Sequence, residues 1–315
     1  MRERDVSLDV FRGLAIALMV PVNYLEHVLA APAWVKHAPD IGLTVADFVA
    51  PFFIFAIGLT YPASLRRRWS TEGKQKTVEH VLRRSLALLG LGALFTLGET
   101  SYGFGHAGVP WGTLQAIGAA SLLAAPLVFV PAGPRLVLGL ALLVGYQLGL
   151  DAWWLEQVLA SSHAGLPGAL SWTALLVLST VVADWLPASP GRVVVLGFGS
   201  LALGIGAAFV TPLSKHRMSL PFVLVVFGAA ILTFFAVRAL LAKGVTAKGL
   251  VAWGKNPLVL YVAHLVLLGA FLVPEARWWH VEASLPQAAV QFVVYAGVLH
   301  ALARGLERKG VFISF

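Results

Sequence analysis

The chain has 315 residues, of which 58% are hydrophobic and only 12% are charged, and its mean hydropathy is +0.82. A soluble domain normally has about a quarter charged residues, so this composition excludes a soluble enzyme or a soluble domain on a single anchor. The net charge of +8 lies in short loops between apolar runs, which excludes the basic face of a nucleic-acid-binding protein. Because cysteine is absent, disulfides, thiolate metal sites and cysteine nucleophiles are excluded as well.

The apolar runs stay unbroken for about twenty residues, the length of a membrane-spanning helix rather than of a barrel strand. They predict an all-α polytopic membrane bundle of about ten transmembrane helices, folded as a single domain over residues 1–315. The first run imitates a signal peptide, but Asn23, Glu26 and His27 interrupt the approach to the small residues that follow, so we expect an uncleaved helix. The predicted spans cover residues 8–30, 44–65, 80–99, 111–130, 135–150, 169–186, 192–212, 219–241, 251–273 and 286–304.

The distribution of positive charge predicts the orientation of these spans. With the N-terminus on the cytoplasmic side, nineteen of the 23 Lys and Arg residues fall on the inner side, as the positive-inside rule requires. The longest inner loop, from Arg66 to Thr77, is polar and basic. Both termini are therefore predicted to be cytoplasmic. The four remaining cations, on the predicted outer side, are Lys36, Lys215, Arg217 and Arg277.

Polar side chains occur at both ends of the first predicted helix. Asp9 and Arg12 are three residues apart near its inner end, where they can form a structural salt bridge or present Arg12 to an anionic ligand. Asn23 and His27 share one face at its outer end, with Glu26 beside them. Such residues are either interfacial or functional.

The first outer loop contains a candidate general base. His37 lies between the first two predicted spans, and imidazole accepts protons near neutral pH. The stretch from Thr44 to Asp47 is typical of a capping box that opens the second helix. Asp47 can also orient His37 if the loop folds inward.

The ninth predicted span carries His264 near the middle of the membrane, three residues after Tyr261. The residue is either a hydrogen-bonding group between helices or part of an internal polar cavity. Asn256 and Pro257 are interpreted as the N-cap and the first residue of this helix. Asp184 is interpreted as an interfacial residue near an outer helix end. No nucleotide-binding or metal-binding motif is present, and no metal is expected.

Four stretches together resemble one family, the membrane acetyltransferases typified by heparan-α-glucosaminide N-acetyltransferase, and more distantly the transmembrane acyltransferase superfamily. The order and spacing fit from residue 7 to about residue 304. The stretches are Ser7–Gly13 with Val22–Tyr24, His37–Asp47 with Pro51–Phe55, Gly112–Gly118, and Gly254–His264.

The resemblance implies that acetyl-CoA is the donor and enters from the cytoplasm, and that an acceptor on the other side, an amino sugar or glycan, receives the acetyl group. It favours an N-acetyltransferase. By the resemblance His37 is the principal catalytic group and Asn23 assists it. Cations on the predicted inner side suit the CoA phosphates. Asn256 and His264 are also assigned to CoA binding. The residues assigned a supporting role in the site are Asp9, Asp47, Gln115 and Tyr261. These cations are Arg12, Arg66, Arg67, Arg68, Arg83, Arg84 and Lys255.

The acceptor and the chemistry stay open at this point. We expect no large N-terminal outer domain of the kind the lysosomal enzyme carries. His37 acts either as a general base, with Asn23 donating to the oxyanion, or through an acetyl-histidine intermediate. The alternatives are an O-acyltransferase of envelope glycans or lipids, and a non-enzymatic transporter. We expect a multi-pass protein of the lipid bilayer, in the cytoplasmic membrane of a prokaryote, and a homodimer is plausible by resemblance.

Overall fold

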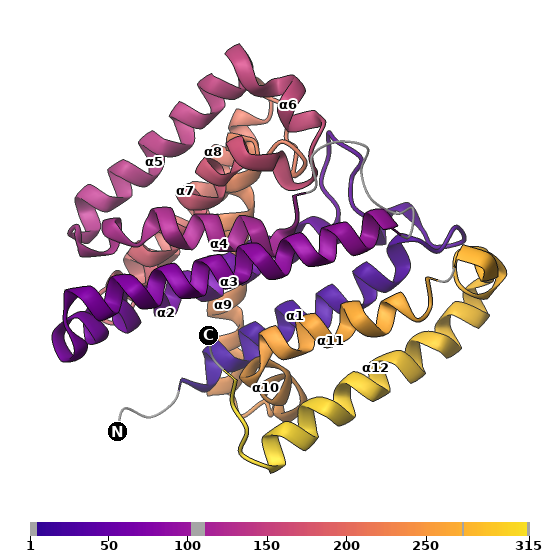
Figure 1. Ribbon diagram of the computed structural model, residues 1–315. Coiled ribbons are helices and arrows are strands. Elements are labelled where there is room, and N and C mark those ends of the chain that lie inside the picture. The colour runs from indigo at the N-terminus through magenta and orange to yellow at the C-terminus, as the bar shows by residue number, and fades with distance from the viewer. Residues whose placement is uncertain (1–4, 102–110, 273, 314–315) are drawn as a thin grey trace. The chain divides into compact units, whose positions relative to one another are not determined.

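The computed structural model describes residues 5–101, 111–272 and 274–313 (Figure 1), and within them every regular element is helical. The only strand-like contact in this part is one isolated bridge between Gly42 and Ser214. The helices are α1 (Val6–Glu26), α2 (Val49–Glu72), α3 (Lys74–Ser101), α4 (Thr113–Ala124), α5 (Ala132–Gly149), α6 (Leu155–Leu159), α7 (Gly165–Trp185), α8 (Pro190–Ala207), α9 (Leu220–Ala242), α10 (Lys248–Lys255), α11 (Pro257–Gly269) and α12 (Leu285–Arg308). Short helical turns are η1 (Ala33–Val35), η2 (Val45–Phe48), η3 (Pro126–Phe129), η4 (Leu150–Trp154), η5 (Ser162–Ala164) and η6 (Pro274–Trp279).

Eight helices of the described part are long and apolar enough to cross a membrane, and α10 with α11 makes a ninth if the bent pair is one span. The predicted all-α membrane bundle is confirmed, and the number of spans agrees roughly with the predicted ten. The difference lies in α4, which has only 12 residues where a span over 111–130 is predicted.

Two predicted boundaries are wrong for local reasons. The basic segment Arg66–Thr77 is not a loop, because α2 continues to Glu72 and α3 begins at Lys74. Gly73 alone separates these helices, and its φ of +86° is a conformation that glycine adopts readily. The ninth predicted span is broken at Asn256, where α10 and α11 meet at 88°. Asn256 and Pro257 do occupy the predicted N-cap and first helical position of α11.

The chain forms two compact units. Unit 1 comprises residues 1–38, 44–49 and 233–315, and unit 2 comprises 39–43 and 50–232. In unit 1, α1 packs closely on α10 because glycines face the partner backbone. A Cβ atom at Gly254 would lie 1.8 Å from the Asp9 carbonyl oxygen, and one at Gly13 would lie 1.9 Å from that of Leu250. This contact fixes the N-terminal half of α1, which carries Asp9 and Arg12.

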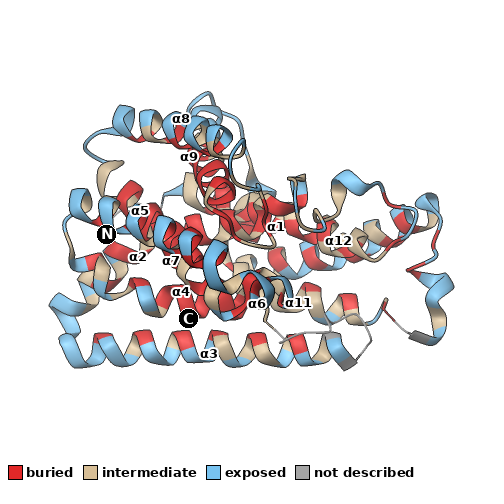
Figure 2. Ribbon diagram, turned by 90° about the horizontal axis from the view of Figure 1, so that it is seen from above, coloured by how far each residue is buried: buried red, intermediate tan, exposed pale blue. Residues whose placement is uncertain are grey.

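Burial differs strongly between helices, as Figure 2 shows. In the apolar stretch that contains α7, 78% is buried inside the protein, whereas only 22% is buried in the corresponding stretches of α8 and α12. The exposed face of α12 is apolar and carries Val290, Val293 and Val294. An apolar exposed face of this kind is expected where a helix contacts lipid.

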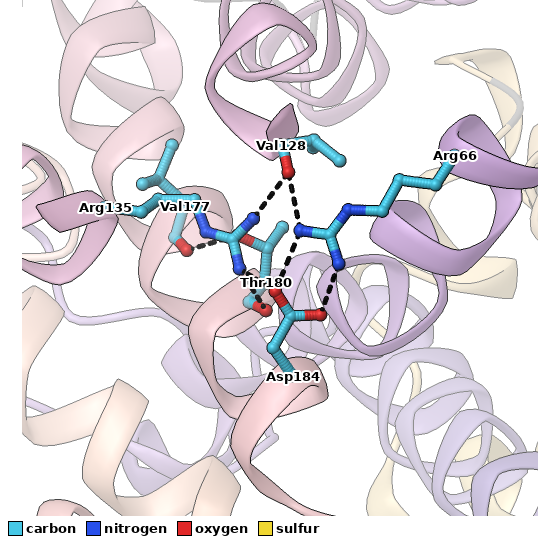
Figure 3. Close-up of polar contacts among 6 residues, drawn as sticks. All are labelled: Arg66, Val128, Arg135, Val177, Thr180 and Asp184. Carbon is cyan, nitrogen blue, oxygen red and sulfur yellow. Dashed lines mark hydrogen bonds and ion pairs between the residues drawn. The ribbon is translucent and has the colours of Figure 1, made fainter. Parts of the chain in front are cut away.

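Unit 2 contains a charge cluster in which the completely buried Arg135 and the partly buried Arg66 and Asp184 meet (Figure 3). Arg66 donates from both terminal nitrogens to the Asp184 carboxylate at 2.9 Å and also to the Val128 carbonyl oxygen at 2.6 Å. Arg135, completely buried, donates to the same carboxylate and to the carbonyl of Val128 at 2.8 Å. Asp184 therefore lies at the helix ends that carry Arg66 and Arg135, which the charge distribution assigns to the inner side. Its interpretation as an outer residue therefore does not agree with the predicted orientation of the chain.

Candidate active site

The segment between α1 and α2, residues 27–48, is called the histidine loop below because it carries His37. Nδ1 of His37 lies 2.9 Å from Oδ1 of Asp47. The His37 side chain is 28% exposed, whereas the Asp47 side chain is completely buried. The backbone N–H of His37 donates to Oε2 of Glu26 at 3.1 Å, which ties the loop to the end of α1.

Asp47 is held in place by the start of η2. The backbone N–H of Thr44 donates to Oδ2 of Asp47 at 2.8 Å, as the predicted capping box requires. The Thr44 hydroxyl donates to the carbonyl oxygen of Lys36 at 2.6 Å, and the N–H of Ala38 reaches Asp47 at 3.4 Å. One carboxylate oxygen thus caps the turn while the other contacts the imidazole, so both interpretations of Asp47 describe its geometry.

Asn23 and His264 meet in unit 1, where α1 lies beside α11 (Figure 1). Nδ2 of Asn23 is 2.9 Å from Nε2 of His264, and the His264 side chain is completely buried. Because an amide nitrogen only donates, Nε2 accepts this hydrogen bond and the ring proton lies on Nδ1. The Tyr295 hydroxyl donates to the His264 carbonyl at 2.8 Å, and the Tyr261 ring stands edge-on to the imidazole at 5.3 Å. His264 therefore orients the amide of Asn23.

The other predicted residues of unit 1 have intramolecular partners. Arg12 lies 3.9 Å from the carboxylate of Asp9, the predicted i, i+3 pair. Lys255 donates to Glu307 at 2.8 Å. Asn256 bonds the C-terminal segment twice, donating to the Val311 carbonyl at 3.0 Å and accepting from the Ile313 N–H at 2.9 Å.

Most of the predicted cations of unit 2 also contact other residues of the protein. Arg66 belongs to the Asp184 cluster, Arg83 pairs with Glu79, and Arg68 pairs with Glu72 at 2.9 Å. Arg84 lies over the Tyr61 ring at 5.9 Å, and Arg67 is exposed on α2. Gln115 accepts the Gly112 N–H at 2.7 Å and so caps the start of α4.

Residues 4–203 match the family "Heparan-alpha-glucosaminide N-acetyltransferase, catalytic", which covers more than half of the chain. The chain belongs to this family. It is 36% identical over 132 residues to the heparan-alpha-glucosaminide N-acetyltransferase of Mus musculus and 35% identical over 138 residues to that of Homo sapiens. These matches cover 39% and 41% of the chain and 19% of each relative, so the chain corresponds to about a fifth of their length. The family and the apolar helices together make it a multi-pass membrane protein.

Two features of this family member escape the sequence-based prediction. Glu26 binds the His37 backbone across eleven positions, and its only signal is its place beside Asn23 at the end of a helix. Asp40 pairs with Arg217, which lies 177 positions away. The hydrogen bond from Arg217 holds the pKa of the Asp40 carboxyl below its ordinary value and raises the pKa of Arg217. In the sequence, the only signal for Arg217 is that it is one of four cations on the predicted outer side.

Proposed function

We propose that the chain transfers an acetyl group from cytoplasmic acetyl-CoA to an amine or hydroxyl of an extracytoplasmic sugar or glycan. The observation that carries this proposal is the 2.9 Å contact between Nδ1 of His37 and the buried carboxylate of Asp47. A buried carboxylate on one ring nitrogen fixes the tautomer and leaves the other nitrogen to accept a proton. The family membership supports acetyl transfer as the reaction.

The proposed reaction requires one base and one oxyanion donor. Nε2 of His37 takes the proton of the acceptor as the acceptor nitrogen or oxygen attacks the thioester carbonyl carbon. Collapse of the tetrahedral intermediate forms the amide or ester and breaks the C–S bond, and the CoA thiolate receives the proton from His37. Asn23, oriented by His264, donates to the developing oxyanion, an effect worth about 3–4 kcal/mol in other acyl-transfer enzymes.

The CoA phosphates are proposed to bind cations on the cytoplasmic side. Arg66, Arg83 and Lys255 already hold carboxylates, so phosphates would have to compete for them. The exposed Arg67 is therefore expected to contribute more to phosphate binding than those three residues.

Loss of acetyl transfer in His37→Ala tests the proposal. The full-length chain is purified in detergent with radiolabelled acetyl-CoA, and glucosamine and envelope glycans are offered as acceptors. Removal of a general base is expected to lower the rate by about 10²- to 10⁴-fold. Acetyl-CoA binding, measured by isothermal titration, is expected to persist, because His37 acts on the acceptor.

His300→Ala is the matched control, since this histidine is exposed on α12 and bonds only Trp253 among the contacts described. It is expected to keep the wild-type rate. Acetyl transfer at the wild-type rate by well-folded His37→Ala protein would exclude His37 as the base. Absence of acetyl-CoA binding by the wild-type chain would favour a transporter instead.

A further inference from the structure

The tip of the histidine loop, residues 39–43, belongs to unit 2 although both flanks belong to unit 1. The tip lies against the segment 212–219 between α8 and α9. The N–H of Gly42 donates to the Leu213 carbonyl at 2.9 Å, and Gly42 and Ser214 form the isolated parallel bridge. Gly42 has a φ of +125°, a backbone conformation that favours glycine. Residues 39–43 of the histidine loop are thus held by the segment 212–219 within unit 2.

The main side-chain contact at this tip joins Arg217 to Asp40. Nε of Arg217 donates to Oδ1 of Asp40 at 2.8 Å, and Nη2 donates to Oδ2, so that the guanidinium and carboxylate meet as a two-pronged pair. The Ser214 hydroxyl donates to the same carboxylate at 2.8 Å and accepts the Arg217 N–H at 3.0 Å. His216 and Asp151 are the other charged or titratable groups that act on the pair.

The segment that bears Arg217, together with the start of α9, is itself fixed by α5 and α7 of unit 2. The Tyr146 hydroxyl on α5 donates to the Arg217 carbonyl at 2.7 Å. The Ser171 hydroxyl on α7 donates to the Met218 carbonyl at 2.7 Å, and Gln147 on α5 accepts the first N–H of α9 at 2.9 Å. Arg217 is therefore presented from an ordered support rather than from a free loop.

Little conformational freedom remains between Asp40 and His37. Pro39 has a φ fixed by its ring, and the Ala38 N–H already contacts Asp47. A displacement of Asp40 must then be taken up at Ala38 or at His37 itself. The position of Asp40 is consequently transmitted to the imidazole through three peptide bonds.

We propose that Arg217 is a positioning residue for His37 and acts by holding Asp40 at the tip of the histidine loop. This inference rests on the proposed function, in which His37 is the base. The two-pronged geometry needs the planar guanidinium, which an ammonium group does not reproduce. The proposal also assigns a role to Arg217, one of the four cations on the predicted outer side of the chain.

Substitution of Arg217 in the full-length chain tests the proposal through the separation of kcat from KM. Arg217→Gln is expected to lower kcat by about 10- to 100-fold, because small misplacements of catalytic groups have effects of this size. KM for acetyl-CoA is expected to stay within about twofold, since Arg217 does not contact the donor in this scheme. Arg217→Lys is expected to fall between Arg217→Gln and the wild type, and it keeps the test usable if Arg217→Gln folds poorly.

Two further variants separate positioning from a general loss of charge. Arg277→Gln is the matched control, because Arg277 is another cation of the predicted outer side and pairs with Glu282 at 3.3 Å with half of its side chain exposed. It is expected to retain the wild-type kcat. The exchange of Asp40→Arg combined with Arg217→Asp restores the ion pair and is expected to recover a substantial part of the activity lost in Arg217→Gln.

A measurement independent of catalysis distinguishes failure of this proposal from failure of the proposed function. The chain has no cysteine, so Ile41→Cys, at a position that is 63% exposed, gives a single site for a nitroxide label. The label is expected to become more mobile in the Arg217→Gln background and to stay unchanged in the Arg277→Gln background. Unchanged mobility, or a kcat within twofold of the wild type in folded Arg217→Gln, overturns the positioning role. An immobile label in a wild-type chain that lacks acetyl transfer overturns the proposed function instead.

Discussion

Asp47 uses its two carboxylate oxygens for different purposes. Oδ2 accepts the Thr44 N–H that opens η2, whereas Oδ1 contacts Nδ1 of His37. Because the capping contact fixes the carboxylate before any substrate binds, the imidazole is oriented in the free protein. Such preorganisation avoids the cost of ordering the group during the reaction.

At the residue scale, the stability of the protein is expected to depend on pH through His280. The ring is completely buried between Tyr24 and Phe271, with centroid distances of 4.6 and 6.0 Å. Burial lowers the pKa of His280 to about 4, below the value of about 6.5 in an unfolded chain. Between these values the unfolded state binds more protons, so stability falls as pH decreases from 6.5 towards 4. His280→Phe keeps the ring and is expected to reduce the fall in melting temperature between pH 7 and pH 5.

Thermal unfolding of the purified chain in detergent at both pH values provides the measurement. His300→Phe is the control, because this ring is exposed on α12, and it is expected to show the same fall as the wild type. An equal fall in His280→Phe and wild type would mean that other groups control the acid sensitivity.

At the element scale, the Asp184 cluster joins the ends of four elements. It connects α2 through Arg66, η3 through the Val128 carbonyl, α5 through Arg135 and α7 through Asp184 (Figure 3). The arginines satisfy backbone carbonyls at helix ends that would otherwise lack partners. The cluster thus explains why the short α4 and η3 end beside α2.

Asp184→Asn is expected to destabilise the chain because it leaves the buried guanidinium of Arg135 without its counter-charge. Removal of one partner of a buried pair typically costs about 3–5 kcal/mol, which will lower the melting temperature in detergent. Glu79→Gln is the matched change from carboxylate to amide in the exposed pair with Arg83, and such pairs contribute roughly 0–1 kcal/mol. Equal melting temperatures for the two variants would contradict a stabilising role for the cluster.

The sequence predicts elements whose causes are local and misses those that depend on tertiary contacts. The span positions follow from continuous apolar runs, and the Thr44–Asp47 cap and the contact of Asp47 with His37 follow from residues close in sequence. The 88° break at Asn256 is not visible in the hydropathy of 251–273, because Asn256 there bonds the distant C-terminal segment. Asp40 with Arg217 and Asn23 with His264 likewise join residues more than 170 positions apart.

At the scale of the whole molecule, the course of α4 decides the number of crossings. Its 12 residues extend only about 18 Å, less than the roughly 30 Å of a hydrocarbon core. Nevertheless α4 runs back along α3, since a Cβ at Gly112 would meet Thr96 and one at Gly118 would meet the Ser85 carbonyl. The hydrogen bond from Arg66 to Val128 then places the end of η3 at the end of α2. The chain between α3 and α5 therefore returns to the side from which α3 started.

This return predicts that the C-terminal end of α2 and the C-terminal end of α9 lie on the same side of the membrane. Gln75→Cys at the start of α3 and Lys243→Cys after α9 are exposed sites in a chain without native cysteine. With the predicted cytoplasmic N-terminus, an impermeant maleimide is expected to label both only after cells are permeabilised. Ile41→Cys and Trp278→Cys, 63% and 64% exposed, are expected to be labelled in intact cells. Labelling of Lys243→Cys but not Gln75→Cys in intact cells would show that the α4 region does not return, and labelling of both would reverse the predicted orientation.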